Sequence, residues 1–453
     1  MNFTLVEGQD ILKRAQTLGA TAGDVFVVQG NSFEGVVRLG AIEKVREARG
    51  KNMTLRLFFG SRHAITSTSD FSPKSLHDLV SDACRLAKLS PEDSYAGLPS
   101  SEVLAPEIPF LDLYDPDVLD RSIDEKIDLA RRAEQAALSS DARIKNSEGA
   151  TIDHATHQIF YAATNGFSGN YTGSSASLSV VPIASENKAM QRDYWYSSRR
   201  KYNDLQSAET IGAVAAARAL RRLGARSVAT QEVPVVFDPE TAASLLSHLA
   251  SALSGYALYK KASFLTDRIG EPIASDMVTI DEDPTLFGAL GSRPFDGEGL
   301  PSTKKRVVER GVLKSYLLDT YSGKKLGLPS TGNASRGPGR SPTVGTTNFH
   351  LMPGTDSPEE IIQSVRSGLY VTELIGFGVN TVTGDYSQGA AGLWIENGAL
   401  AYPVEEITIA GNLREMFLQV ERVGNDLDRS KPTSAPTVKI ARMMVAGRER
   451  EAC

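Results

Sequence analysis

The sequence contains very little cysteine. Its 453 residues include only Cys84 and Cys453, so we expect no disulfide framework, and a reducing compartment is the natural environment. Cys84 falls in a segment whose apolar residues recur at helical spacing, where a thiol behaves as a small apolar side chain. We therefore predict that Cys84 is buried and structural.

Long apolar runs and an excess of positive charge are also missing. No stretch approaches the roughly 20 consecutive apolar residues of a membrane-spanning helix, and the N-terminus has acidic residues where a secretory signal begins with basic ones. Lysine and arginine total 49 against 55 aspartates and glutamates, a net charge of −6, which disfavours a general nucleic-acid surface. We expect a cytoplasmic protein that binds neither nucleic acid nor membranes.

Residues 1–225 predict an N-terminal α+β domain. A first amphipathic helix is followed by short β-rich segments separated by glycine or asparagine, and this pattern predicts a small antiparallel sheet. The segments are residues 24–29, 34–39, 43–48, 53–59 and 62–69. In the fourth segment Met53, Leu55 and Leu57 share one face, which indicates a sheet covered on one side by the helix that starts with Pro73.

A proline-rich connector at residues 90–118 divides this domain into sub-units of about 1–90 and 119–225. The second sub-unit opens with Ser122 and Glu125 in the spacing of a capping box. It continues through a hairpin at Asn165 and Gly166 and a helix that stops at Gly224.

Residues 226–453 predict a β-rich C-terminal domain with a few helices. Hairpin-like pairs of strands dominate, and Ser357 and Glu360 begin a short helix that we expect Gly368 to close. Because strands cluster in runs instead of alternating with helices, the fold class is α+β.

The stretch GVNTVTGDYSQGAAGLWIENG at residues 378–398 is unusually rich in glycine. It has an acid where a phosphate-binding loop needs lysine, which excludes that kind of site. A dinucleotide site is also excluded, because it needs a helix after the glycines, whereas two short strands about Asn397 and Gly398 follow here. Glycines that allow close backbone packing beside a hairpin fit the pattern better. Exposed amides of such a turn could also pair with an extended peptide as an added strand.

The histidines offer little support for a metal site. None of the six is followed by glutamate, as a zincin helix requires. His154 and His157 are the only close pair, and on a strand that spacing points the two rings to opposite faces, so we expect a surface strand. A metal site around Asp153, His154 and His157 in a stand-alone peptidase is the least favoured alternative. We expect His248 to be packed or half-exposed beside a leucine stripe.

Two further sets of charged residues admit a catalytic or binding role. Asp296 and Glu298 could act as acid and base, although acids in a glycine-rich turn are typically solvated turn formers. Residues 330–343 predict a mobile loop whose two arginines are solvated or meet a substrate carboxylate.

The segment GFGVNTVTGDYSQGAAGLWIENGALAYPVEEITIAGNL resembles the C-terminal signature of the TldD/PmbA (TldE) proteins, also called peptidase U62 or modulator of DNA gyrase proteins. FDGEGLPSTKKRVVERGVLKSYLLD and LPSTGNASR extend this resemblance, which covers nearly the whole chain. The resemblance implies a cytosolic heterodimer. Its TldD-type subunit carries zinc on a His-Glu-x-x-x-His helix plus a cysteine and cleaves unfolded peptides, including microcin and antitoxin precursors.

This chain departs from the TldD-type subunit at the metal helix. Ser247 and Ala252 stand where that subunit has its two histidines, His248 takes the glutamate position, and no cysteine lies between Cys84 and Cys453. The resemblance is therefore to the PmbA/TldE branch, whose members lack the metal set.

From this resemblance we expect a subunit with no catalytic or metal-binding residue of its own, which joins a zinc-bearing TldD-type partner, or forms a homodimer when alone, and helps to bind unfolded peptides. A non-enzymatic interaction protein of the gyrase-modulator type is the alternative. The signature positions expected to face substrate or partner are Asn380, Thr383, Gly384, Asp385, Tyr386 and Ser387.

Overall fold

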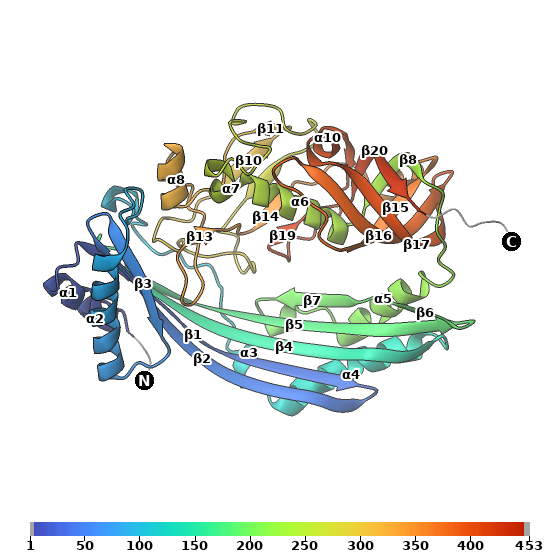
Figure 1. Cartoon of the computed structure of the whole chain (residues 1–453). Helices are drawn as coiled ribbons and strands as arrows, with labels where there is room; N and C mark the ends of the chain where they lie inside the picture. Colours follow the sequence, from blue (N-terminus) through green and yellow to red (C-terminus); the bar gives the residue numbers. More distant parts are fainter. Residues whose placement is uncertain (1–3, 448–453) are drawn as a thin grey trace.

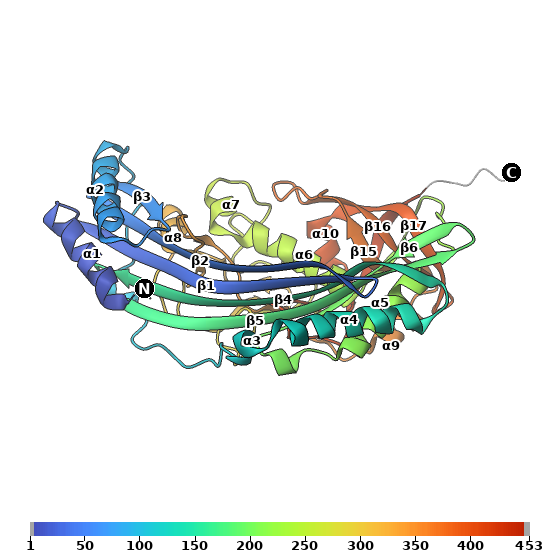
Figure 2. The same ribbon diagram turned by 90° about the horizontal axis from the view of Figure 1, so that it is seen from below.

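The computed structural model describes residues 4–447 and confirms the α+β fold. A long curved sheet runs along the molecule, with helices on its outer face and the β-rich C-terminal part against its inner face (Figure 1). Figure 2 shows the outer helices lined up along the sheet from one end to the other. Among the described residues, no helix is both long and apolar enough to span a bilayer.

The N-terminal sheet has seven strands in the order β3-β2-β1-β4-β5-β6, and β7 also pairs with β5. All of its pairings are antiparallel. Because β1 pairs with β4 from Asp24↔Ala163 to Val37↔Ala150, both predicted sub-units contribute to one sheet. The strands are β1 (Ala22–Arg38), β2 (Ala41–Phe59), β3 (Arg62–Thr68), β4 (Ile144–Ala163), β5 (Ser168–Glu186), β6 (Ala189–Arg192) and β7 (Trp195–Arg199).

The outer helices cover the sheet in two groups. They are α1 (Leu5–Thr17), α2 (Pro73–Leu89), α3 (Asp117–Asp120), α4 (Ile123–Ser140) and α5 (Ala208–Leu220). Helices α1 and α2 form one apolar core that includes Cys84, while α4 and α5 form a second core farther along the strands. Cys84 is buried, as predicted. The predicted start of a helix at Pro73 and the capping box of Ser122 and Glu125 are also confirmed.

The five short strands predicted near the N-terminus are wrong in number. The first two form the single strand β1, and the next two form β2, so Gly30, Asn31 and Gly50 lie within strands. These residues suggest turns because glycine and asparagine favour them. Gly30 serves a different purpose, since a Cβ there would lie 2.0 Å from the Thr156 carbonyl oxygen.

The inner face of the sheet is also covered, contrary to the prediction of a single covered side. Thr54, Arg56 and Phe58 are buried on the face opposite Met53 and Leu55. The predicted connector after α2 contains no strand and leads to α3, with one short 3₁₀ turn at Ser101–Val103.

Two main sheets build the C-terminal part. A six-stranded sheet has the order β17-β16-β15-β8-β20-β18, and an added β17–β20 pairing closes five of these strands on themselves. A five-stranded sheet has the order β11-β10-β9-β14-β19, and β12 pairs with β13. The strands of the first sheet are β8 (Gln231–Phe237), β15 (Ser367–Ile375), β16 (Asp385–Glu396), β17 (Ala399–Asn412), β18 (Val420–Val423) and β20 (Val438–Ala446).

The remaining elements are shorter. The strands outside the first sheet are β9 (Ile280–Glu282), β10 (Lys305–Glu309), β11 (Val312–Leu313), β12 (Ala334–Ser335), β13 (Thr343–Val344), β14 (Phe349–Leu351) and β19 (Thr433–Ser434). The helices are α6 (Pro239–Leu253), α7 (Gly255–Tyr259), α8 (Thr320–Leu326), α9 (Pro358–Gln363) and α10 (Leu413–Leu418).

Local turn and cap signals in the C-terminal part are confirmed except at one glycine. Ser357 and Glu360 form the predicted capping box of α9. Asn397 and Gly398, both with positive φ, join β16 to β17, although these strands are longer than expected. Gly368 does not close α9. It lies in β15, where a Cβ would approach the Pro234 carbonyl oxygen to 2.6 Å.

The pairing of Gly30 with Gly50 provides a matched test of this packing. We expect Gly30→Ala to lower the free energy of unfolding by about 1–3 kcal/mol, because the added methyl group meets backbone that cannot yield freely. Gly50→Ala is the control, since nothing lies within 4 Å of a Cβ there. Urea unfolding of both variants measures the difference, and equal stabilities would contradict the close-approach explanation.

Candidate functional site

A buried charged group joins the N-terminal sheet to the C-terminal part. Asp24 on β1 is fully buried, and its Oδ2 accepts hydrogen bonds from Arg56 Nε and Nη2 on β2, at 2.8 and 2.5 Å. Its Oδ1 accepts a hydrogen bond of 2.7 Å from Arg336, whose side chain is itself fully buried. Charges this deep are tolerated only when they are paired and hydrogen-bonded.

Asp296 and Glu298 belong to the same buried region, so the expectation of solvated turn formers is wrong. Both are 1% exposed. Asp296 is occupied by backbone, because its Oδ1 accepts the N–H groups of Glu298 and Leu300, at 2.9 and 3.0 Å. Glu298 lies 3.6 Å from the Arg56 guanidinium, which places it next to the Asp24 group.

Of these two acids, Glu298 has the carboxyl whose pKa lies near neutral pH. Burial raises the pKa of its carboxyl to about 7, although the nearby Arg56 opposes the rise, and the negative charge of Asp296 adds to it. Burial also raises the pKa of Asp296. A carboxyl that ionises near neutral pH can exchange a proton under ordinary conditions, but Asp296 is held by the backbone, so the two are not arranged as a free acid and base.

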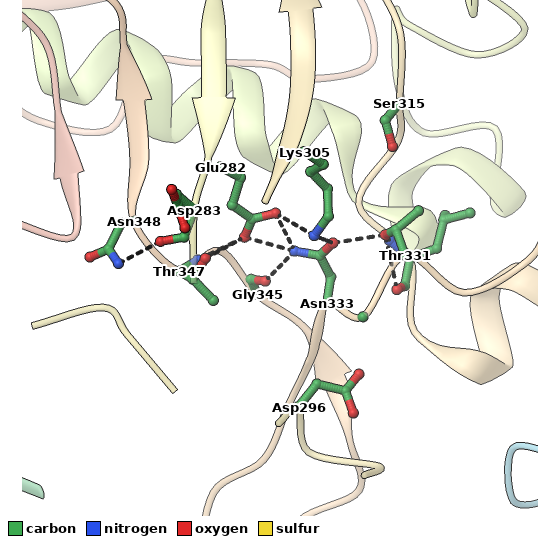
Figure 3. A network of polar contacts seen from close by, with 12 residues as sticks. Glu282, Asp283, Asp296, Lys305, Ser315, Thr331, Asn333, Gly345, Thr347 and Asn348 are labelled. Atoms are coloured by element: carbon green, nitrogen blue, oxygen red, sulfur yellow. Dashed lines mark hydrogen bonds and ion pairs between the residues drawn. The ribbon is translucent and has the colours of Figure 1, made fainter. Parts of the chain in front are cut away.

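The loop at residues 330–343 makes hydrogen bonds on both sides, with Glu282 in the C-terminal part and with Asp24 in the N-terminal sheet. The sequence did not predict these contacts. Asn333 donates to both carboxylate oxygens of Glu282, each at 2.9 Å. Figure 3 shows that Lys305 and Thr347 converge on the same carboxylate. The prediction that the two arginines are solvated is wrong for Arg336, whose side chain is fully buried, and correct for Arg340, which is exposed.

A cavity of about 330 Å³ opens beside Glu298 and Arg56. Its wall includes tyrosines from α7 and α8 and residues from the connector and the N-terminal sheet. The lining residues that bear on its chemistry are Arg56, His63, Asp93, Tyr256, Tyr259, Glu298, Asp319 and Tyr321. Burial and the charge of Arg56 lower the pKa of His63, so this imidazole contributes little positive charge.

The six signature positions form a tight turn at the start of β16. Asp385 is exposed, and its carboxylate accepts hydrogen bonds from Thr383 Oγ1 at 2.6 Å and Asn412 Nδ2 at 3.2 Å. Gly384 has φ +88°, and a Cβ there would meet Asn412 Oδ1 at 2.8 Å. The turn is therefore built from internal contacts that require its glycine.

Five backbone amides of this turn are already used as hydrogen-bond donors. The N–H groups of Asn380, Gly384 and Ser387 donate to the carbonyls of Asp385, Asn380 and Gly378. The N–H groups of Val382 and Asp385 donate to the side chains of Asn380 and Thr383. These bonds argue against the addition of a peptide strand at this turn.

Helix α6 carries the positions that the resemblance assigns to zinc in a TldD-type subunit. Ser247 is exposed and donates to the Ala243 carbonyl, and Ala252 is fully buried. His248 is half-buried, with its ring centroid 6.2 Å from that of Tyr386, as expected for a packed histidine. A zinc site needs three or four nitrogen, sulfur or oxygen ligands, and one histidine beside alanine and serine does not fit zinc.

The alternative metal site on β4 does not assemble either. His154 is buried between Phe33 and Tyr202, which corrects the expectation of a surface strand. His157 faces Tyr171 on the opposite side of the sheet, as its spacing predicted. In the part of the chain that the structure describes, no group of three or more histidine, cysteine, aspartate or glutamate residues could hold a metal ion.

From the sequence, Arg336 was identified only as a loop arginine, and Asp24, Arg56, Asp319 and the cavity tyrosines were not identified. One signal was available for Arg56, because it interrupts an apolar β-rich segment, whereas Asp24 stands at the first position of its segment. A charge within such a segment indicates a buried ion pair when both faces of the strand are covered.

Comparisons with known proteins agree over most of the chain. Family models described as PmbA/TldA metallopeptidase domain 1, central domain and C-terminal domain match residues 23–87, 116–223 and 230–447. Metalloprotease PmbA of Escherichia coli O157:H7 is 39% identical over 90% of this chain and 89% of its own length. A PmbA homologue of Haemophilus influenzae is 36% identical over 96% of this chain and 94% of its own.

Solved structures show the same fold. A Bacteroides thetaiotaomicron protein named as a modulator of DNA gyrase superposes with a TM-score of 0.90 at 29% identity, covering 97% of this chain and 98% of that one. TldE of Thermococcus kodakarensis superposes with a TM-score of 0.88 at 22% identity, covering 98% of this chain and all of that one.

Asp24 provides the test of the buried group. We expect Asp24→Asn to lower the free energy of unfolding by about 3–5 kcal/mol, because it leaves two buried guanidinium groups with too little negative charge. Asp10→Asn, at an exposed carboxylate 3.6 Å from Lys13, is the control and changes stability by at most about 0.5 kcal/mol. Chemical denaturation measures both, and a small effect at Asp24 would contradict the assigned role.

Glu298 gives a pH dependence of definite sign. Its folded-state pKa of about 7 exceeds the ordinary value of 4.5, so its contribution to stability is fully present below pH 4.5 and is lost as the pH rises through 7. The free energy of unfolding of Glu298→Gln, relative to that of the wild type, should therefore rise by about 1–3 kcal/mol as the pH increases from 5 to 8. Denaturation of both proteins across this range tests the sign, and a constant difference would refute it.

Proposed function

Because the chain belongs to the PmbA/TldD metallopeptidase family, we propose that it is the metal-free, PmbA/TldE-like subunit of a zinc metallopeptidase. In this proposal a TldD-type partner supplies zinc and the bond-breaking chemistry, and this chain contributes to assembly and to the binding of unfolded peptides. Peptide maturation and antitoxin degradation in the cytoplasm are the corresponding processes.

The observation that carries this proposal is the composition of α6. Its three relevant positions hold a serine bonded to its own helix, a histidine packed beside Tyr386 and a buried alanine. Such a helix serves the packing of the C-terminal core, where Leu245, Leu249 and other apolar residues of α6 are buried. A peptidase built on this subunit therefore needs its metal ligands from another chain.

The loop before β16 supports a role in assembly. Phe377 is fully exposed at 105% of its reference area, Val382 on the same loop is 49% exposed, and Ile375 at the end of β15 is 56% exposed. Exposed apolar side chains gathered on one loop are typical of protein contact surfaces. The signature turn holds this loop in place through the internal bonds of Asp385 and Asn412, so we assign the signature residues to the support of a partner-facing loop.

The experiment is reconstitution with a zinc-bearing TldD-type subunit. We expect this chain alone to bind no stoichiometric zinc and to leave an unfolded polypeptide, such as reduced and alkylated casein, intact. The mixture should cleave the polypeptide, with zinc recovered in the partner. Zinc-dependent cleavage by this chain alone would refute the proposal, and complex formation without any cleavage would favour the interaction-protein alternative.

A matched pair of variants tests the loop. We expect Phe377→Ser to weaken binding of the TldD-type subunit at least tenfold in a sedimentation or calorimetric titration, because a central exposed aromatic ring contributes strongly to contact surfaces. Phe110→Ser is the control, since Phe110 is 80% exposed on the connector. Equal affinities for both variants would show that the loop does not face the partner.

A further inference from the structure

The cavity between the two halves of the molecule has an unusual lining. Three tyrosines, Tyr256 and Tyr259 on α7 and Tyr321 on α8, share its wall with carboxyl groups. The acids are Asp93 from the connector, Glu298, and Asp319 at the start of α8. Neither the metal helix positions nor the signature turn contributes to this wall, so the cavity is a separate feature of the chain.

The tyrosines form a continuous aromatic cluster. The rings of Tyr256 and Tyr321 are nearly parallel, with centroids 6.1 Å apart, and Tyr259 lies 5.5 and 6.0 Å from them. The ammonium group of Lys325 already lies 5.5 Å from the Tyr321 centroid, and that of Lys260 lies 5.9 Å from the Tyr259 centroid. These separations are within the range of cation–π attraction, so the cluster is suited to positively charged groups.

Asp319 brings an unused acceptor to this cavity. The residue is 1% exposed, and its Oδ1 caps α8 by accepting from the Ser322 N–H and hydroxyl, at 2.8 and 2.6 Å. Its Oδ2 is buried and has no hydrogen-bond partner among the described residues. The neighbouring Tyr256 hydroxyl donates to the Pro342 carbonyl, at 3.4 Å. Burial and the Asp319 carboxylate, with which this hydroxyl also interacts, raise the pKa of Tyr256. A buried carboxylate oxygen without a donor costs free energy that an incoming donor would recover.

The charge of the lining is also unbalanced. Arg56 is the one arginine among the lining residues, and it already donates twice to Asp24. Tyr321 donates to Asp93 at 2.9 Å, and burial together with this bond raises the pKa of Tyr321 to about 12, so its hydroxyl stays neutral. Among the residues that line the cavity, three carboxyl groups therefore stand against one guanidinium, and the ammonium group of Lys325, outside the lining, acts on Asp93.

We propose that this cavity binds the cationic side chain of a peptide, a lysine or an arginine. Its aromatic wall attracts the positive charge, Asp319 Oδ2 accepts one of its N–H groups, and the aliphatic stem packs on the tyrosine rings. The proposal deepens the proposed function, because it assigns a class of side chain to the peptide that this subunit helps to hold.

The test is a calorimetric titration of this chain alone with blocked pentapeptides. The probes are acetyl-Ala-Ala-Lys-Ala-Ala-amide, its arginine counterpart, and its norleucine counterpart, which has the length of lysine without the charge. We expect the lysine or arginine peptide to bind at least tenfold more tightly than the norleucine peptide. Equal affinities, or no binding of the charged peptides at millimolar concentration, would overturn the proposal.

Variants locate the binding. Asp319→Asn keeps an acceptor for the α8 cap but removes the charge, and Tyr256→Leu removes a ring, so each should lower the affinity for the charged peptides at least tenfold. Asp276→Asn, at an exposed residue elsewhere, should leave it unchanged. Unchanged affinity in both cavity variants would overturn the proposal. If Asp319→Asn does not fold, Tyr256→Leu and the norleucine comparison decide.

Two further comparisons are needed. One separates a cationic side chain from a chain terminus as the bound group, and the other separates this inference from the proposed function. An unblocked penta-alanine amide presents an α-ammonium group, and exclusive binding of that probe would mean that the cavity takes a chain terminus, which overturns the side-chain assignment. Because the titrations use this chain alone, they succeed or fail independently of zinc or of complex formation. Reconstituted cleavage without any charge preference would leave the proposed function standing and remove this inference.

Discussion

The arrangement of the two halves depends on the charge of Asp24. A fully buried carboxylate is tolerated here because Arg56 from its own sheet and Arg336 from the C-terminal part both donate to it, and each guanidinium in turn requires the carboxylate. Arg336 can reach Asp24 only when the loop at residues 330–343 lies on the inner face of the sheet. The Gly339 N–H adds to this contact by donating to Thr54 Oγ1 at 2.7 Å, so the docking has a fixed register.

Local signals in the sequence predicted local structure well, and they failed where one residue type serves two purposes. The capping boxes at Ser122 and Ser357 and the Asn397 turn depend on neighbours within a few residues, so the sequence contains all the information they need. Gly30 and Gly368 were misread because the glycine that a turn requires is the same glycine that a crowded strand requires. Only the position of the opposing carbonyl distinguishes these cases, and that carbonyl comes from a distant segment.

The buried ionic group was beyond the sequence for a related reason. Asp24, Arg56 and Arg336 come from separate segments, and the approach of Asp296 and Glu298 to them depends on the same docking. The alternation in β2 correctly placed Leu55 on a covered face, but nothing in that alternation reports a second covering layer. When a strand is covered on both faces, its polar face looks like a solvent-exposed face in the sequence, because the sequence does not show which segment covers it.

The polar chemistry of this chain is therefore concentrated away from α6, at the joint between the halves. Helix α6 is occupied with packing, whereas Glu298, Asp319 and the tyrosines surround open space. This joint is also connected to the signature turn, because α7 supplies Tyr256 and Tyr259 and the chain just beyond it reaches the loop through the Phe264 N–H, which donates to the Thr381 carbonyl at 2.9 Å. A contact on the loop and a group in the cavity thus bear on the same short segment, residues 255–264, whose backbone joins the two places.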